Sequence, residues 1–200
     1  LHSDSVHAGD WCACPDFCYW KAPLFELDGK TIGIIGFGSI GQKVAHIAES
    51  FGMNVLFNSR SKKDTSDFKT AKQVALDYLL ENSDFVSCHC PLTNETENII
   101  NKENLNKMKK SAYLINTSRG PVVDEQALAD ALNSGKIAGA ALDVLKAEPA
   151  NPANPLLSAE NCIITPHIAW AAKETRQRLL NILDKNIESC INGNPQNKVN

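Results

Sequence analysis

Three side chains in this sequence suit acid–base chemistry and carboxylate binding, and they are Arg119, Glu148 and His167. The guanidinium of Arg119 suits a carboxylic acid substrate, because it can hold a carboxylate and an adjacent keto oxygen with directed hydrogen bonds. His167 carries an imidazole, which exchanges a proton near neutral pH. Glu148 would accept a hydrogen bond from the second imidazole nitrogen, fix the tautomer and favour the protonated ring. Together they predict protonation of a developing alkoxide while a hydride reaches the carbonyl carbon.

Each of these residues, taken alone, is more often an ordinary exposed loop residue than a functional one. A stronger signal lies upstream, where an apolar segment at 31–35 runs directly into the spacing GxGxxG. Gly36 permits a tight turn, Gly38 lets a pyrophosphate approach the backbone, and Gly41 lets the following helix pack against the strand. The N-terminus of that helix favours the anion. We therefore predict a dinucleotide site at Gly36, Gly38, Ser39, Ile40 and Gly41.

The elements that position these residues alternate between strands and helices from residue 31 onward. We predict strands at 31–35, 54–57, 85–89, 112–116, 137–142 and 162–165. We predict helices at 39–50, 72–80, 124–133 and 172–191. Such alternation predicts an α/β fold, a doubly wound, Rossmann-like parallel sheet covered on both faces. Residues 1–28 lack this pattern and are interpreted as a linker that enters a dinucleotide-binding domain at 29–200.

Two helices have apolar faces that we expect to be buried. In the helix at 39–50 this face is Val44, Ile47, Ala48 and Phe51. In the helix at 172–191 it is a stripe of Leu179, Leu180, Leu183, Ile187 and Ile191. Polar loops follow the strands at 36–39, 58–60, 89–93, 116–120, 143–148 and 166–170. Because ligands bind beyond the carboxyl ends of parallel strands, we expect the active site where these loops converge.

Composition excludes several other classes of function. The chain has 200 residues, 43% of them hydrophobic, and a net charge of −3, which gives no reason to expect nucleic acid or a membrane surface as partner. Its seven cysteines are an odd number, which favours reduced thiols and a cytoplasmic location. The cluster Cys12, Cys14 and Cys18 has spacings that match common zinc sites poorly, so we expect no metal.

The ordered blocks GFGSIG at 36–41, HCPLT at 89–93, NTSRG at 116–120, Asp143 through Glu148-Pro149, and TPHIAW at 165–170 resemble a known family. They are similar to the D-isomer-specific 2-hydroxyacid dehydrogenases, particularly the glycerate dehydrogenase (hydroxypyruvate reductase) branch. The resemblance runs from about Ser5 to the end of the chain. It implies that Arg119, Glu148 and His167 are the catalytic set. It also implies that Thr117 and Asp143 line the nicotinamide half of the cofactor pocket, with Cys90 and Pro91 beneath the adenosine side.

Two departures from the family pattern carry expectations of their own. Family members have a further N-terminal substrate lobe of about 100 residues, a domain's worth, so we expect a piece of a longer protein that ends naturally at Asn200. We expect it to bind nucleotide but to turn over substrate poorly or not at all. The strand ending near residue 57 lacks the usual Asp for a ribose diol, and Ser59 with Arg60 instead suits a 2′-phosphate. The cofactor is therefore NAD(P), with NADP slightly favoured over NAD.

Several alternatives remain open at this point. The substrate is a small 2-hydroxy or 2-oxo acid, with glycerate/hydroxypyruvate and glycolate/glyoxylate both compatible, and the family resemblance implies a homodimer. A nucleotide-sensing interaction protein is the main rival, because C-terminal-binding-protein corepressors have the same fold and similar motifs. Formate dehydrogenases pair the catalytic His with a Gln, so Glu148 argues against that branch.

Overall fold

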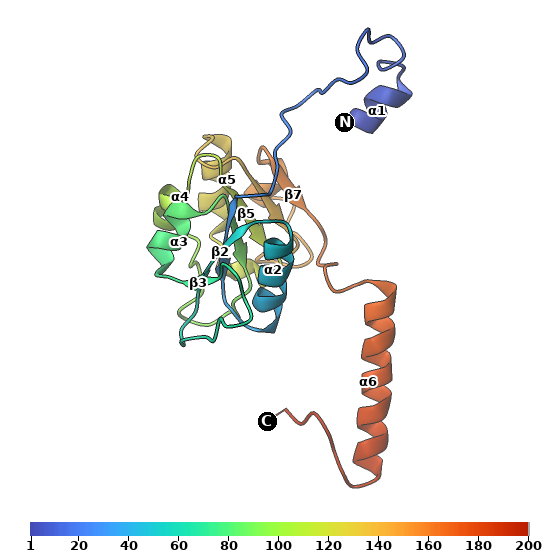
Figure 1. Cartoon of the computed structure of the whole chain (residues 1–200). Helices are drawn as coiled ribbons and strands as arrows, with labels where there is room; N and C mark the ends of the chain where they lie inside the picture. The colour runs from blue at the N-terminus through green and yellow to red at the C-terminus, as the bar shows by residue number, and fades with distance from the viewer. Residues whose placement is uncertain (200) are drawn as a thin grey trace.

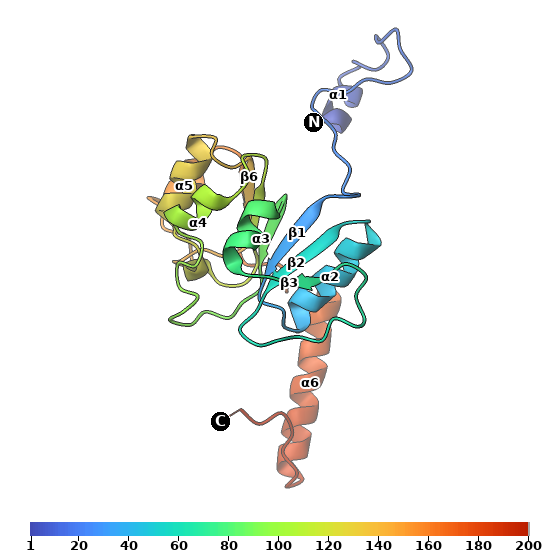
Figure 2. The same cartoon turned by 60° about the vertical axis from the view of Figure 1, so that its left-hand side comes forward.

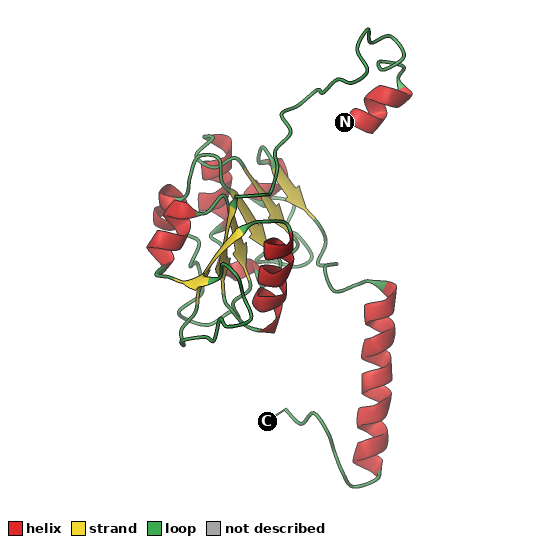
Figure 3. Ribbon diagram, viewed as in Figure 1, coloured by secondary structure: helices red, strands yellow, loops and turns green. Residues whose placement is uncertain are grey.

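The computed structural model describes residues 1–199 of the chain, and a seven-stranded parallel sheet forms its centre (Figure 3). The strand order is β3-β2-β1-β4-β5-β6-β7, so the chain reverses direction across the sheet between β1 and β4. This is the Rossmann-like sheet that the alternating pattern predicts. The strands are β1 Thr31–Ile35, β2 Asn54–Asn58, β3 Lys72–Gln73, β4 Phe85–Cys88, β5 Tyr113–Asn116, β6 Gly139–Leu142 and β7 Cys162–Ile164.

The helices lie on both sides of this sheet, but unevenly. Figure 2 shows α3, α4 and α5 on one face and α2 on the other. Two short 3₁₀ helices, η1 and η2, complete the connections. The bounds are α1 His2–His7, α2 Ser39–Ser50, α3 Leu76–Asn82, α4 Lys102–Lys107, η1 Gly120–Val122, α5 Glu125–Asn133, η2 Pro155–Ser158 and α6 Lys173–Ile191.

Alternate strand residues build two separate hydrophobic cores, because successive side chains of a strand point to opposite faces. Ile35, Val86 and Leu114 belong to the core beneath α3, α4 and α5. Ile34 and Phe57 belong to the smaller core beneath α2, where Phe57 stacks on Phe37 with ring centroids 3.7 Å apart. The central strands are therefore held from both sides, and the loops that follow them start from fixed positions.

The face that carries α2 is covered only over the first strands of the sheet. Toward the opposite edge the side chains on that face become exposed, with Tyr113 of β5 at 41% and Ile163 of β7 at 67%. The expectation of a sheet covered on both faces is thus met for β1 and β2 but not for β5 to β7. The far half of that face is solvent-exposed in the described chain.

The C-terminal helix α6 stands away from the sheet, and so does the N-terminal segment that contains α1 (Figure 1). No residue of α6 is buried. The expectation of a buried apolar stripe on this helix is therefore wrong for the described chain, since Leu180, Leu183 and Ile191 are all more than half exposed. Among residues 1–199, no helix has the length and apolarity needed to cross a membrane.

The inner face of α2 is only partly the one expected, since Ala48 is buried and Val44 packs half-buried against the core, but the two other expected residues do not pack there. The buried residues are Gly41, Ala45 and Ala48, whereas Ile47 and Phe51 are each 59% exposed. Small side chains let the helix approach the sheet closely. The sequence argument failed because it ranked residues by hydrophobicity alone and took no account of the helix–sheet distance.

The segment predicted as one helix at 72–80 is instead an edge strand followed by a shorter helix. Lys72 and Gln73 pair with Leu56 and Phe57 as β3, and α3 starts only at Leu76. The Gln73 side chain donates to the carbonyl oxygens of residues 59 and 61, which favours the extended backbone. Helix α4 was not predicted at all, because six residues are too few to show a helical period.

Candidate active site

All strands are parallel, so the loops after them meet at one edge of the sheet. The first of these loops is the glycine turn between β1 and α2. Gly36 has φ +95°, and a Cβ there would lie 2.5 Å from the backbone nitrogen of Cys90. A Cβ on Gly41 would lie 2.2 Å from the Gly36 carbonyl oxygen, so the helix packs against the turn. Gly38 caps α2 with no atom within 4 Å of its Cβ position, which leaves room for a phosphate at the helix N-terminus.

A cavity of about 460 Å³ opens in front of this turn. Ser59 and Arg60, which follow β2, line it on one side. Cys90 and Pro91, which follow β4, line it on the other. Ser39 and Ile40 begin α2 at its rim and are exposed. The structure thus gathers the residues expected around the pyrophosphate and adenosine in one place. It adds Lys63 to the lining, a residue that the basic sequence from Arg60 onward already signalled.

At the other end of the same edge, His167 and Glu148 form a hydrogen-bonded pair. Nδ1 of His167 lies 2.7 Å from Oε2 of Glu148, although the two residues are 19 positions apart. The second oxygen of Glu148 accepts from the backbone N–H of Leu145 at 3.0 Å. The hydrogen bond from His167 is the main reason that the pKa of Glu148 lies below its usual value. Both side chains are about two-fifths exposed, so a ligand can reach the ring.

The backbone at His167 has φ +54°, which is unusual for a residue with a side chain. Asp143 holds this conformation, because its carbonyl oxygen accepts from the His167 N–H at 2.8 Å. Asp143 is only 5% exposed, and its carboxylate accepts hydrogen bonds from Ile168 N at 2.9 Å and Ala169 N at 2.8 Å. The Thr165 hydroxyl also donates to it. Burial acts to raise the pKa of Asp143, but these hydrogen bonds outweigh it and hold the pKa below its usual value.

Asp143 therefore contacts the loop at 165–169, which carries His167, more closely than the sequence indicated. It does line the cavity next to His167, a space of about 460 Å³. All three of its donors, however, come from residues 165–169. Sequence reasoning placed Asp143 at the nicotinamide and missed this role, since only the folded loop shows which donors face the carboxylate.

Arg119 lies in the loop after β5, next to the loop that carries Glu148. A Cβ on Gly120 would lie 2.0 Å from the carbonyl carbon of Leu145, so the two loops touch backbone to backbone. Arg119 itself is exposed and donates to the carbonyl oxygen of Ser118 at 2.7 Å. Within the part of the chain that the structure describes, no hydrogen bond joins Arg119 to Glu148 or His167. Thr117 is likewise exposed on this loop. The structure therefore brings the loop of Arg119 against the loop of Glu148, but it places neither Arg119 nor Thr117 in the lining of the two cavities at this edge.

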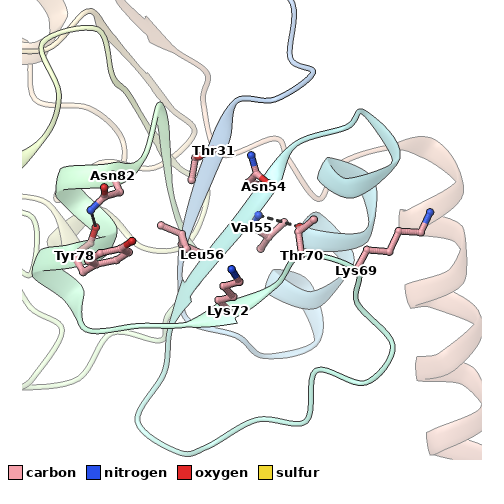
Figure 4. Close-up of a pocket in the computed structure, with 9 residues that line it drawn as sticks. All are labelled: Thr31, Asn54, Val55, Leu56, Lys69, Thr70, Lys72, Tyr78 and Asn82. Atoms are coloured by element: carbon pink, nitrogen blue, oxygen red, sulfur yellow. Dashed lines mark hydrogen bonds between the residues drawn. The ribbon is translucent and has the colours of Figure 1, made fainter.

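A groove of about 350 Å³ lies at the opposite end of the sheet, where β1 and β2 begin (Figure 4). Its polar groups are used within the protein, since Val55 N donates to the Thr70 hydroxyl and Asn82 donates to the Tyr78 carbonyl oxygen. Lys69 and Lys72 supply its charge, and none of its lining residues within the described part of the chain carries a carboxylate. The carboxyl edge, with its paired imidazole and carboxylate, is therefore the candidate active site.

All seven cysteines are free thiols in the structure. Burial raises the pKa of Cys88 and of Cys90, so both thiols stay protonated near neutral pH. Among residues 1–199, no group of three or more His, Cys, Asp or Glu side chains is placed to hold a metal ion.

Comparison with known proteins gives a consistent result. The chain is 52% identical over 199 residues to a hydroxypyruvate reductase of Blautia hydrogenotrophica, with 100% of this chain and 62% of the relative covered. It is 44% identical over 200 residues to a glycerate dehydrogenase of Methylorubrum extorquens, with 99% and 62% covered. The chain thus spans about three-fifths of the length of these relatives.

Solved structures agree with the fold. A D-lactate dehydrogenase with NAD⁺ from Lactobacillus jensenii has a TM-score of 0.82 at 31% identity, covering 96% of this chain and 63% of that one. An acyclic imino acid reductase in complex with NADPH and D-Arg has a TM-score of 0.80 at 36% identity, covering 98% and 62%. Residues 2–169 match the family described as D-isomer specific 2-hydroxyacid dehydrogenase, NAD binding domain. The chain belongs to the D-isomer-specific 2-hydroxyacid dehydrogenases, as their dinucleotide-binding domain.

Proposed function

We propose that this chain is the cofactor-binding and proton-transferring part of an NAD(P)-dependent oxidoreductase. The reaction interconverts a small D-2-hydroxy acid and its 2-oxo acid, with glycerate/hydroxypyruvate or glycolate/glyoxylate as the substrate pair. The observation that carries the proposal is the hydrogen-bonded pair of His167 and Glu148 at the same sheet edge as the glycine turn. The names of the relatives, hydroxypyruvate reductase and glycerate dehydrogenase, support this substrate class.

Each residue has a definite role in the proposal. Nε2 of His167 gives a proton to the substrate oxygen during reduction and takes it back during oxidation. Glu148 holds Nδ1, so the ring keeps its orientation and the imidazolium is stabilised by a neighbouring negative charge. Arg119 binds the substrate carboxylate. The nicotinamide of a bound dinucleotide would supply or accept the hydride. Gly36, Gly38 and Gly41 fit the pyrophosphate of that dinucleotide, because side chains at these positions would distort the turn or fill the space in front of it.

The length of the relatives bears on how active this chain is by itself. It spans about three-fifths of them, so we propose that it binds nucleotide but reduces hydroxypyruvate slowly when alone. The test compares this chain alone with a chimera, in which the part of the Blautia relative that this chain does not span is fused to this chain. We expect the chain to bind NAD(P)H and the chimera to reduce hydroxypyruvate at least about 100-fold faster. Equal rates for the two proteins would contradict this.

Cofactor choice rests on the loop after β2. Ser59 and Arg60 line the cavity together with Lys63, and no carboxylate follows β2 before Asp64. This favours a 2′-phosphate, and hence NADP, slightly over NAD. Glu95 also lines the cavity and works against a phosphate, which keeps the preference small. Removing the guanidinium with Arg60→Ala should weaken NADPH binding about tenfold and leave NADH binding nearly unchanged. Unchanged NADPH affinity in this variant would refute the phosphate assignment.

We further propose that the protein is a homodimer. Ile47 and Phe51 of α2, and Tyr113 and Ile163 on the bare half of the same sheet face, are large apolar side chains that are exposed in a single chain. Light scattering coupled to size exclusion tests this directly. A mass of one chain at micromolar concentration would contradict it.

A further inference from the structure

The position of Glu148 depends on a loop that has little regular structure of its own. This loop connects β6 to η2, and Glu148 lies near its middle. Glu148 makes one contact inside the loop, where its Oε1 accepts from Leu145 N. That contact ties the side chain to the start of the loop, but it does not tie the loop to the rest of the protein. Asp143 ties the start of the loop to residues 165–169, so the stretch from Lys146 onward is the part that needs a contact of its own.

Glu125 supplies that external contact from the first turn of α5. Its Oε1 accepts from the backbone N–H of Lys146 at 2.7 Å, two residues before Glu148. Its Oε2 accepts from the side-chain amide of Asn154 at 2.9 Å, six residues after Glu148. One carboxylate therefore holds both ends of the segment that presents Glu148. Asn154 is buried and its own oxygen accepts from Leu156 N at 3.0 Å, so the second end is anchored to η2.

The same stretch of backbone touches the loop that carries Arg119. A Cβ on Gly120 would lie 2.0 Å from the Leu145 carbonyl carbon and 2.4 Å from Lys146 N. The peptide between Leu145 and Lys146 is therefore in contact with the Arg119 loop, and its N–H is the group that Glu125 holds. Any shift of this peptide changes the spacing between the two loops.

Helix capping does not account for Glu125. The N-cap of α5 is Asp124, whose carboxylate accepts from Ala127 N at 3.1 Å. Glu125 is half-buried, and both of its oxygens point to the loop after β6 rather than to its own helix. A carboxylate needed only for the helix N-terminus would have no reason to make these two bonds.

We propose that Glu125 is a positioning residue that fixes the loop carrying Glu148, and through it the contact between Glu148 and His167. This rests on the proposed function, in which that contact orients the proton-transferring imidazole. Glu125 touches neither substrate nor cofactor in this account. Its effect reaches the reaction only through Lys146, Asn154 and the loop between them.

The test is the substitution Glu125→Ala in this 200-residue chain, followed by NMR. The first readout is the pKa of Glu148, measured from its side-chain carboxyl ¹³C signal and assigned with Glu148→Gln. His167 lowers this pKa in the wild type, so the variant should raise it toward the ordinary value of 4.5. The second readout is amide exchange at Lys146, which should accelerate about tenfold or more after loss of a hydrogen bond to a charged group.

Glu103→Ala is the matched control, because Glu103 also lies in the first turn of a helix, is exposed, and among the described residues pairs with Lys107 of its own helix rather than with another loop. It should change neither readout. If Glu125→Ala does not fold, Glu125→Gln replaces it. The Gln variant keeps one acceptor oxygen, so it should give a smaller change in the same direction.

The positioning role is overturned if the folded variant keeps the wild-type pKa of Glu148 and the wild-type exchange rate at Lys146. It is also overturned if Glu103→Ala produces the same changes. These readouts need no turnover and no bound nucleotide. A failure of the chimera to reduce 2-oxo acids would therefore refute the proposed function separately and leave the placement of Glu148 by Glu125 measurable.

Discussion

Asp143→Asn is the most informative single substitution for the site, because it changes a buried charge without changing shape. Asp143 is 5% exposed and its carboxylate accepts from Thr165, Ile168 and Ala169. An asparagine keeps one acceptor oxygen. At best it retains two of these bonds in uncharged form, and it places an NH₂ group against the remaining donor.

The cost follows from these bonds. A hydrogen bond to a charged group contributes about 1.5–3 kcal/mol, and one such bond is lost while two are weakened. We therefore expect Asp143→Asn to lower the free energy of unfolding by about 3 kcal/mol. For a chain of this size the melting temperature falls by roughly 2–4 °C per kcal/mol, so the drop at pH 7 should be about 6–12 °C. Asp67→Asn, at an exposed site, is the control and should change it by less than about 1 °C.

The pH dependence provides a second check by differential scanning calorimetry. The pKa of Asp143 in the folded state is below its ordinary value of 3.8. Its stabilisation is thus complete above the unfolded pKa and is lost as pH falls through the folded pKa. The difference between wild type and Asp143→Asn should be constant from pH 7 to about pH 5 and shrink below pH 3.8. A melting temperature within 1 °C of wild type at pH 7 would refute the assignment of Asp143 as the anchor of the His167 loop.

Four further substitutions test other parts of the account. A Cβ at Gly38 would meet no protein atom but would enter the space proposed for the pyrophosphate, so Gly38→Ala should keep the melting temperature and weaken NAD(P)H binding. A Cβ at Gly36 would meet backbone at 2.5 Å, so Gly36→Ala should lower both the melting temperature and the affinity for NAD(P)H. Fluorescence titration with calorimetry separates the two, and equal effects would count against the turn. Gly120→Ala should destabilise the fold by several kcal/mol, because its Cβ would collide with the Leu145 backbone at 2.0 Å. An unchanged unfolding midpoint in urea would show that the loops of Arg119 and Glu148 are not in contact. Burial acts to raise the pKa of Glu49, but hydrogen bonds from three backbone N–H groups and one hydroxyl hold the pKa below its ordinary value of 4.5. Glu49→Gln should therefore remove stability that the wild type has above about pH 4.5. A variant as stable as the wild type at pH 7 would contradict this.

The sequence was sufficient for six of the seven strands and for the glycine turn, because these are local patterns. The apolar strand before Gly36 and the spacing of the three glycines identify the turn, although the close approach of the Cys90 backbone to Gly36 is seen only in the folded chain. The convergence of the loops then follows from parallel strands. The placement of His167 beside Glu148 was predictable for the same reason, since both follow neighbouring strands of one sheet.

Other features depend on distances that no local pattern encodes. Ile47 and Phe51 have the period of a buried helix face, yet α2 packs through Gly41 and Ala45 because the sheet lies close beneath it. The apolar stripe of α6 was read correctly as a pattern, but the described chain places no partner against it.

The residues that hold the site in place could not be predicted from the sequence, for a similar reason. Glu125 meets Lys146 across 21 residues, and the three donors to Asp143 come from a loop more than 20 residues away. Neither arrangement follows from spacing or composition. Residues that act through hydrogen bonds to backbone can be any polar type in the right place, so only the folded chain identifies them.

A crystal structure of the chain with NADPH, and a second one with NADH, would test the central claim most directly. The account predicts the pyrophosphate at Gly36 and Gly38, the adenosine beside Arg60, and the nicotinamide ring within contact distance of His167, with the bond to Glu148 intact. A dinucleotide seated in the groove beside Lys72, or one whose nicotinamide lies away from His167, would contradict it.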